Sequence, residues 1–220
     1  MTAAPIWLQS FVGDREEAPS RTPAVRLAVA RVRALAQRRL VWLRAIAGDA
    51  TADGSLETRR LDLALDDRDN PEAERRWYVE SRDPRIQTLT RELQAIEAEL
   101  ERDRESALAE IVTRLGLTPG ERDALHVAVA MTIEPGLLSV CGYLHNDPDC
   151  TYVSEALVAQ LCGRSLPLLS RDGALLGWRV LHEGAAQTGR PAPLTLDPYI
   201  LEHASGLDAT DPVLAPYSSA

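Results

Sequence analysis

The sequence predicts a mainly α-helical protein, in which a long, coiled-coil-like antiparallel helical hairpin is followed by a smaller domain of short helices with a β-hairpin. Two observations indicate this fold class. Apolar residues recur at three- and four-residue steps along two long stretches within residues 21–116. After residue 116, helix-start and helix-stop residues alternate at short intervals, and two short strand-like runs follow.

The first long helix is expected to run from Thr22-Pro23 to Ala47 and to end at Gly48. Its apolar residues recur at helical spacing and so share one face. They are Val29, Val32, Ala36, Leu40, Leu43 and Ala47.

Two segments flank this helix. Residues 1–20 are expected to be a loosely attached leader. Residues 48–70 are rich in turn-forming and charged residues and are expected to be a connector. Within the connector, Leu61, Leu63 and Leu65 alternate with polar residues, which is a weak pattern for a short strand.

A second helical stretch is expected to start at Asn70-Pro71 and to restart at Asp83-Pro84. An apolar seam of the heptad type follows the restart. It consists of Ile86, Leu89, Leu93, Ile96 and Leu100. The seam shifts after Leu100 and resumes at Leu108, which predicts a stutter through Arg104.

The two long helices carry opposite charges. Seven arginines and no acidic residue lie between Arg21 and Arg44, whereas acidic residues dominate from Glu92 to Glu110. The simplest arrangement pairs the helices as an antiparallel hairpin over residues 21–116. Exposed ion pairs contribute at most about 1 kcal/mol each, so apolar burial must hold the hairpin together.

The segment after residue 116 is expected to form three short helices joined by tight turns. Thr118-Pro119 starts the first, with Glu121 placed to complete a capping box. The second follows the break at Glu134-Pro135-Gly136. The third is expected to be capped by Thr151 and stopped by Gly163, with its core-facing residues at Val153, Leu157 and Leu161.

A β-hairpin is expected next. Its first strand lies in the glycine-bounded run from Gly173 to Gly184, and its second is Leu194-Thr195-Leu196. Trp178 and Tyr199 are expected to be core residues of this hairpin region. A last helix starts at Asp197-Pro198 and continues to Ala204. Three helices followed by a hairpin predict a winged helix over residues 117–206, followed by a linker over 207–220.

The segments LTPGERDALHVAVAMTIEP, GYLHND and TYVSEALVAQLC occur in this order. They resemble the winged-helix domain at the front of AAA+ ATPases from contractile injection systems. The matching positions are Thr118–Asp123, Glu134–Pro135, Tyr143–Asp147, Thr151–Val153 and Asp197–Leu201. Pro148-Asp149-Cys150 departs from the family, which often carries basic residues at this point.

The resemblance implies a function. The chain would be the N-terminal part of a bacterial AAA+ ATPase, a non-catalytic module for protein interaction and assembly. Its partners would be particle components or other subunits of an ATPase oligomer. ATP and magnesium would bind in a C-terminal module beyond residue 220, not in this chain.

The chain contains no lysine, so all 24 of its Lys/Arg residues are arginines. The Walker A motif GxxxxGK[ST] needs a lysine to reach the nucleotide phosphates. A lysine Schiff base is excluded for the same reason. This chain is therefore expected to have no catalytic residues, cofactor or enzyme activity of its own.

A helix-turn-helix also suggests a DNA-binding transcription regulator, which would dimerise through its long helices. DNA binding needs several basic residues aimed at phosphates. The third helix, Thr151–Cys162, has none, and twelve acidic residues outnumber five arginines from Thr118 onward. We therefore expect a protein partner and no nucleic acid. The candidate interaction surface consists of Tyr152, Glu155, Gln160, Arg31 and Arg38.

Metal binding is not expected. Cys141, His145, Cys150 and Cys162 match no zinc-ligand spacing, and core thiols explain the cysteines better. The four histidines stand apart and are expected in surface or capping roles. The odd number of cysteines, the absence of a signal-peptide pattern and the absence of a run of ~20 apolar residues indicate a cytoplasmic protein without a membrane segment.

Overall fold

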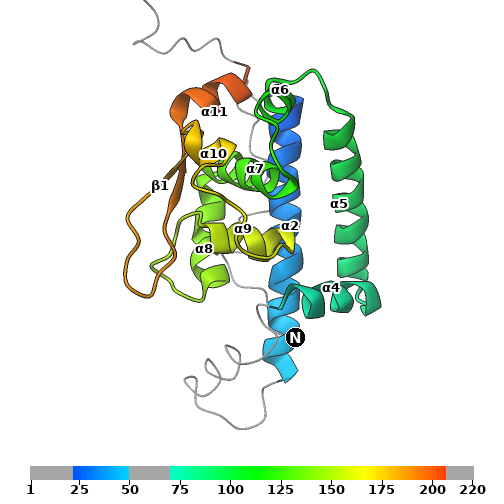
Figure 1. Ribbon diagram of the computed structural model, residues 1–220. Coiled ribbons are helices and arrows are strands. Elements are labelled where there is room, and N and C mark those ends of the chain that lie inside the picture. The colour runs from blue at the N-terminus through cyan, green and yellow to red at the C-terminus, as the bar shows by residue number, and fades with distance from the viewer. Residues whose placement is uncertain (1–21, 50–69, 207–220) are drawn as a thin grey trace, which may run out of the picture.

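One long helix, α2 (Pro23–Asp49), runs through the middle of the protein (Figure 1). The structure is a computed structural model that describes residues 22–49 and 70–206. The expected leader, the linker over 207–220 and the leucine pattern of the connector lie outside the described residues. Thr22 Oγ1 accepts a hydrogen bond from the Val25 N–H at 3.5 Å, which confirms the expected start of the helix.

Two helices follow on one side of α2, namely α4 (Pro71–Glu80) and α5 (Pro84–Arg102). The Asn70 side chain caps α4 by accepting from two backbone N–H groups, and Asp83 caps α5 by accepting from the Arg85 N–H. Proline occupies the first turn of both helices. The expected start and restart are therefore confirmed.

Helix α5 lies beside α2 and runs antiparallel to it (Figure 1). Leu93 packs against Ala34 and Leu35. Other residues of α2, including Val25 and Val32, are buried in the core that α2 shares with the short helices. Because α2 packs against both α5 and the short helices, the expected hairpin that stands apart as an arm is not confirmed.

The expected stutter through Arg104 is wrong, because the chain leaves the helix there. Helix α5 ends at Arg102, and the Asp103 carboxylate accepts from the N–H groups of Glu105 and Ser106 at 3.2 and 3.1 Å. Ser106 then caps α6 (Ala107–Arg114). Aspartate and serine side chains compete with the helical backbone for its hydrogen bonds, which explains the break.

The helix-turn-helix core consists of α7 (Pro119–Ile133), the 3₁₀ turn η2 (Pro135–Leu137), α8 (Leu138–His145) and α9 (Glu155–Cys162). The capping box of Thr118 and Glu121 is confirmed. The expected cap of the third helix is wrong: Ser154 caps α9, not Thr151. Val153 accepts from the Leu194 N–H at 2.7 Å, and this strand-like pairing keeps the chain extended up to Ser154.

The wing is shorter than expected. Strands β1 (Leu181–Glu183) and β2 (Leu194–Leu196) pair antiparallel, with Leu181 opposite Leu196. The first half of the expected strand is instead the helical turn α10 (Ala174–Gly177). Helix α11 (Pro198–Ala204) follows β2, as expected.

Helix α7 lies at the centre of the core, where ten of its fifteen residues are buried. Leucines and valines of α2, α8, α9 and both strands pack around it. Among the described residues, no single helix is long and apolar enough to cross a membrane. Helix α7 together with Pro135–His145 reaches that composition, but the two parts are bent by 106°.

Candidate functional site

Helix α9 occupies the place of the helix that would read DNA in a helix-turn-helix protein. It packs against α7, α8 and α2 (Figure 1). Each of its eight residues is buried or half-buried, and Leu157 and Val158 are fully buried. A DNA groove or a flat protein surface therefore has no exposed residue of this helix to contact.

Three members of the expected interaction surface, namely Tyr152, Glu155 and Gln160, belong to α9 or precede it. The Glu155 carboxylate accepts from the backbone N–H groups of Leu168 and Leu169 at 2.5 and 2.8 Å. The Tyr152 hydroxyl donates to the Pro191 carbonyl at 2.9 Å. Gln160 is half-buried. The Glu155 and Tyr152 groups fix the loops that follow α9, and their role in binding a partner stays a prediction.

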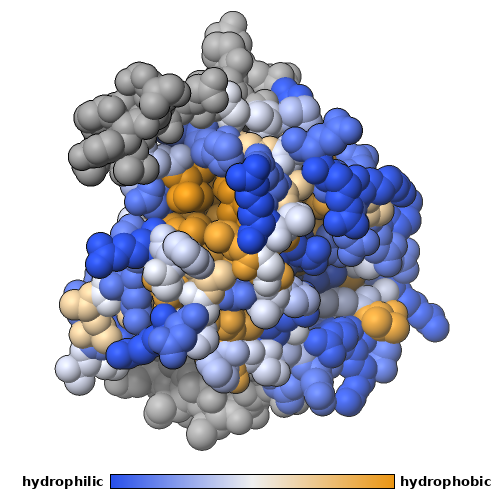
Figure 2. Space-filling model, turned by 45° about the horizontal axis from the view of Figure 1, so that its top comes forward, coloured by the Kyte–Doolittle hydropathy of each residue, from blue (hydrophilic) through white to orange (hydrophobic). Residues whose placement is uncertain are grey.

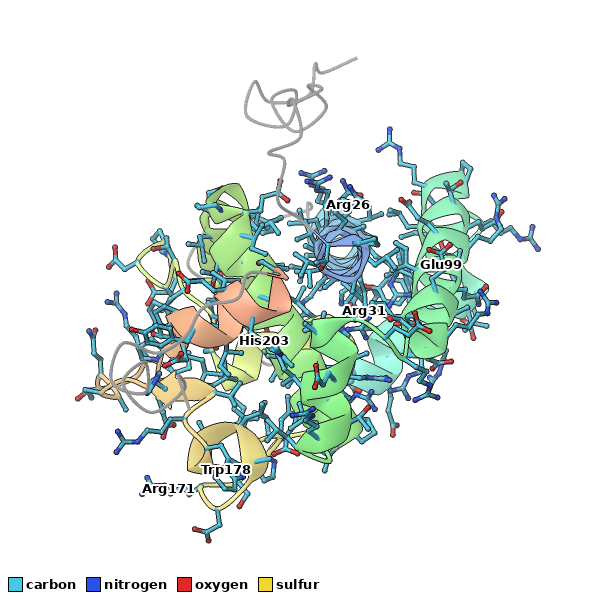
Figure 3. The ribbon with its side chains drawn as sticks, turned by 90° about the horizontal axis from the view of Figure 1, so that it is seen from above. Arg26, Arg31, Glu99, Arg171, Trp178 and His203 are labelled. Carbon is cyan, nitrogen blue, oxygen red and sulfur yellow. The ribbon has the colours of Figure 1, made fainter. Side chains whose placement is uncertain are left out.

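Arg31 joins three helices. Its guanidinium lies between α2 and α5 (Figure 3) and pairs with Glu97 at 3.1 Å. It also pairs at 2.9 Å with Asp123 of α7, a fully buried carboxylate that in addition accepts from Arg164 at 2.8 Å. Because Arg31 is only 6% exposed, this cation stabilises the interior and offers little to a partner.

A second buried cluster fixes α4 to α2. Arg39 pairs with Glu74, and the Tyr78 hydroxyl donates to the same carboxylate. Burial raises the pKa of Glu74, although Arg39 and the hydrogen bond from Tyr78 act in the opposite direction. Arg38, the last member of the expected interaction surface, lies 4.3 Å above the Tyr78 ring.

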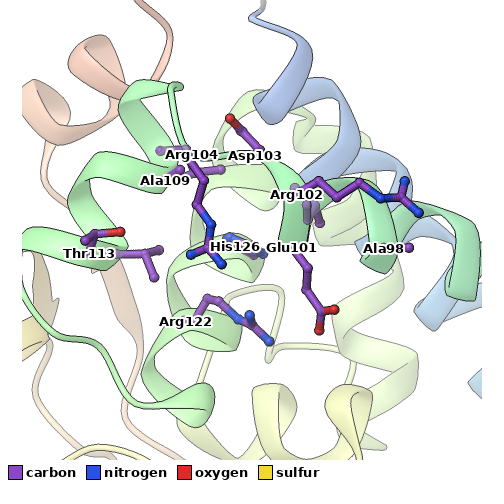
Figure 4. A pocket seen from close by; sticks show the side chains of 12 residues that line it. Ala98, Glu101, Arg102, Asp103, Arg104, Ala109, Thr113, Arg122 and His126 are labelled. Atoms are coloured by element: carbon purple, nitrogen blue, oxygen red, sulfur yellow. The ribbon is translucent and has the colours of Figure 1, made fainter.

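A pocket of about 460 Å³ lies between the end of α5, the turn to α6 and the first half of α7 (Figure 4). We call it the turn pocket. No pattern in the sequence predicted this pocket, although Arg122 and His126 stand one helical turn apart on α7. Its ionisable lining residues are Glu101, Arg102, Asp103, Arg104, Arg122 and His126.

His126 is 5% exposed, so the expected surface or capping role is wrong for this histidine. Its Nδ1 atom is buried and has no hydrogen-bond partner within the described part of the chain. Burial, and then the positive charge of Arg31, lower the pKa of His126 from 6.5 to about 3. The ring is therefore neutral at physiological pH.

This pKa predicts a loss of stability in acid. Between pH 6.5 and about 3 the unfolded chain binds a proton at His126 that the folded protein does not, so stability falls as the pH falls. From pH 7 to pH 5 the loss should be about 2 kcal/mol. Urea unfolding at both values measures it. His126→Gln should remove this part of the loss, whereas His203→Gln, at a half-exposed position, should retain it. Equal losses in the two variants would contradict the assignment.

Burial raises the pKa of Cys141 and of Cys162 to about 12, so both remain thiols at neutral pH. Cys141 and Cys150 are buried, and Cys162 is half-buried. No group of three or more His, Cys, Asp or Glu side chains able to hold a metal ion exists among residues 22–49 and 70–206.

The expected core positions of Trp178 and Tyr199 are wrong, since these residues are 75% and 39% exposed. Figure 3 places Trp178 and Arg171 at the periphery of the molecule. Figure 2 shows a group of apolar side chains on one face, bordered by hydrophilic ones. An exposed tryptophan with arginines near it in sequence has the composition of an interaction hot spot. In the sequence, this exposed site is indicated only by the neighbouring residues Trp178 and Arg179, which follow α10.

A family model described as "Winged helix domain, variant" matches residues 30–218. The match includes most of α2 and all of α4, α5 and α6, as well as the helix-turn-helix core and the wing. No curated protein and no solved structure matches the chain. Because the match spans most of the sequence and the fold has the helices and the hairpin of that family, the chain belongs to the variant winged helix domain family.

Proposed function

We propose that this chain is a non-catalytic protein-interaction and assembly module, the N-terminal part of an AAA+ ATPase associated with a contractile injection system. The order of the motifs from Thr118 to Leu201 supports this assignment, and the winged helix fold is the one that the resemblance implies. The partner is a particle component or another subunit of the ATPase, in the cytoplasm. ATP and magnesium act in a C-terminal module, not here.

The proposal rests on the burial and the charge of helix α9. This helix has no exposed residue and no basic residue, and its Glu155 carboxylate is committed to backbone N–H groups. A winged helix that reads DNA inserts exposed polar and basic side chains of this helix into the major groove. The covered helix therefore argues against the reading of DNA by α9, and a protein partner binds at another surface.

The arginines of α2 support the same conclusion. Arg31 pairs with Glu97 and Asp123, Arg39 pairs with Glu74, and Arg33 pairs with Glu134 at 2.6 Å. Cations that are neutralised within the fold release no counterions from DNA phosphates. We expect a partner to contact the exposed apolar side chain of Trp178.

Reading the coding DNA beyond the codon for Ala220 tests the assignment to an ATPase. We expect the reading frame to continue into a Walker A motif that contains the lysine this chain lacks. A stop codon directly after residue 220, with no ATPase gene beside it, would contradict the proposal.

The alternative function, a DNA-binding regulator that dimerises through its long helices, predicts the opposite result in a gel shift. We expect no complex with long duplex DNA at about 50 mM salt, where non-specific electrostatic binding is strongest. Micromolar binding that weakens steeply with added salt would favour the regulator. Arg171 and Arg179 are exposed arginines near the wing, so the double variant Arg171→Gln/Arg179→Gln would then show whether the wing is responsible.

A further inference from the structure

Neither a residue of α9 nor Trp178 lines the turn pocket, and the proposed function does not use it. Three arginines line it: Arg102 and Arg104 from the end of α5 and the following turn, and Arg122 from α7. Among the described residues, none of the three forms a salt bridge. Arg31, Arg33, Arg39, Arg164 and Arg190, in contrast, are all paired with carboxylates.

The carboxylates of the pocket do not balance these cations. Asp103 and Glu101 carry two negative charges against the three positive charges of the arginines, and the Asp103 carboxylate accepts from the N–H groups of Glu105 and Ser106. Glu101 is exposed and lines the pocket without a salt bridge in the described part of the chain. The side chains of Arg104, Arg122 and His126 gather in the pocket, with Glu101 at its edge (Figure 4). The pocket therefore holds an excess of positive charge.

His126 provides an independent observation. Its ring is 95% buried, since only 5% is exposed, and it lines the pocket with an Nδ1 atom that has no partner among the described residues. A buried polar atom without a hydrogen bond is unfavourable, and such atoms in native proteins are usually satisfied by a bound group or by water. A neutral imidazole nitrogen can donate to, or accept from, an oxygen of a ligand.

We propose that the turn pocket binds a small, doubly charged oxyanion of the phosphate or dicarboxylate class. The guanidinium groups of Arg104 and Arg122 bind its oxygens, because the fork of N–H donors in arginine matches both kinds of group. The His126 ring lies beside these groups in the lining of the pocket, so a bound oxyanion changes its surroundings. A volume of about 460 Å³ is in the range of small-molecule sites. The negative charge of Glu101 in the lining repels the ligand and so weakens its binding.

The test uses the full 220-residue chain at neutral pH and low salt, where charge interactions are least screened. Inorganic phosphate and succinate are titrated separately, followed by calorimetry and by the NMR signals of the histidine rings. We expect saturable binding of at least one ion and a shift of the His126 signals, with no shift for the half-exposed His182 and His203. Binding of phosphate alone or of succinate alone identifies which oxyanion the site prefers.

Variants assign the binding to the pocket. Arg104→Gln and Arg122→Gln should each weaken binding about tenfold, as expected for the loss of a charge-assisted hydrogen bond. Glu101→Gln should strengthen binding about threefold by removing the repelling charge. Arg85→Gln, at an exposed position in the first turn of α5, is the matched control and should bind as the wild type does.

Three results would overturn the proposal. The first is that neither ion shows saturation up to about 10 mM, a concentration at which weak specific sites fill. The second is that Arg104→Gln binds as strongly as Arg85→Gln. The third is that the ions bind without moving the His126 signals. Arg104 is exposed, so its replacement should leave the fold intact. The Arg104→Gln variant therefore shows whether the ion binds in the turn pocket even if Arg122→Gln does not fold.

Discussion

Replacing Leu93 with aspartate is expected to lower the free energy of unfolding by about 3–5 kcal/mol. Leu93 is 2% exposed and packs between α5 and α2 against Ala34 and Leu35. The substitution removes apolar contacts and places a carboxylate in an apolar cluster between the two helices. Urea unfolding followed by circular dichroism measures the change.

Gln94→Asp is the matched control, because it adds the same charge at the next, exposed position of α5. It should change stability by no more than about 0.5 kcal/mol. If Leu93→Asp unfolds at the same urea concentration as the wild type, α5 does not pack on α2 in solution. If both variants lose stability equally, the effect comes from the added charge and not from the lost packing.

The helix starts could be predicted from the sequence because they depend on neighbouring residues. Asn70, Asp83, Thr118 and Asp197 all accept hydrogen bonds from backbone N–H groups one turn ahead, and proline follows each of them. A cap and the groups that it satisfies lie within four residues. No knowledge of the tertiary structure is needed to identify them.

Short apolar runs were harder to assign. The residues Ala174–Gly177 were expected to be a strand, but they form α10 and bury Leu175. A run of four apolar residues has no clear period, so the pattern fits a strand and a buried helical turn equally well. Only the partner strand decides, and Leu194–Leu196 is long enough to pair with Leu181–Glu183 alone.

The partners of the buried charged residues could be predicted from the sequence only in part. The sequence predicted that the arginines of the first helix would meet the acids of the second, and Arg31 does pair with Glu97. It did not predict Asp123 or Glu74 as partners. These contacts join segments that are far apart in the chain, and a single sequence carries no signal for such a pairing. For the same reason neither the turn pocket nor the burial of His126 could be predicted.

The second large loss of stability is expected when the buried ion pair between Arg39 and Glu74 is broken. Both side chains are almost fully buried, and Tyr78 donates to the same carboxylate. Arg39→Met retains most of the apolar stem but leaves the Glu74 carboxylate without this cation. Breaking a buried ion pair from one side typically costs about 3–5 kcal/mol, because the remaining charge is desolvated and uncompensated. We expect a loss of this size in urea unfolding.

The double variant Arg39→Met/Glu74→Gln tests the cause. Glutamine removes the charge but keeps a carbonyl oxygen that can accept from the Tyr78 hydroxyl. Replacing both members of a buried pair by neutral groups is often nearly neutral for stability. We therefore expect the double variant to recover most of what Arg39→Met loses, and together with the single variant Glu74→Gln this gives a coupling energy of about 2–3 kcal/mol. Losses that simply add would mean that the two side chains act independently and that α4 is held to α2 by the contact of Trp77 with Trp42, whose ring centroids are 5.3 Å apart.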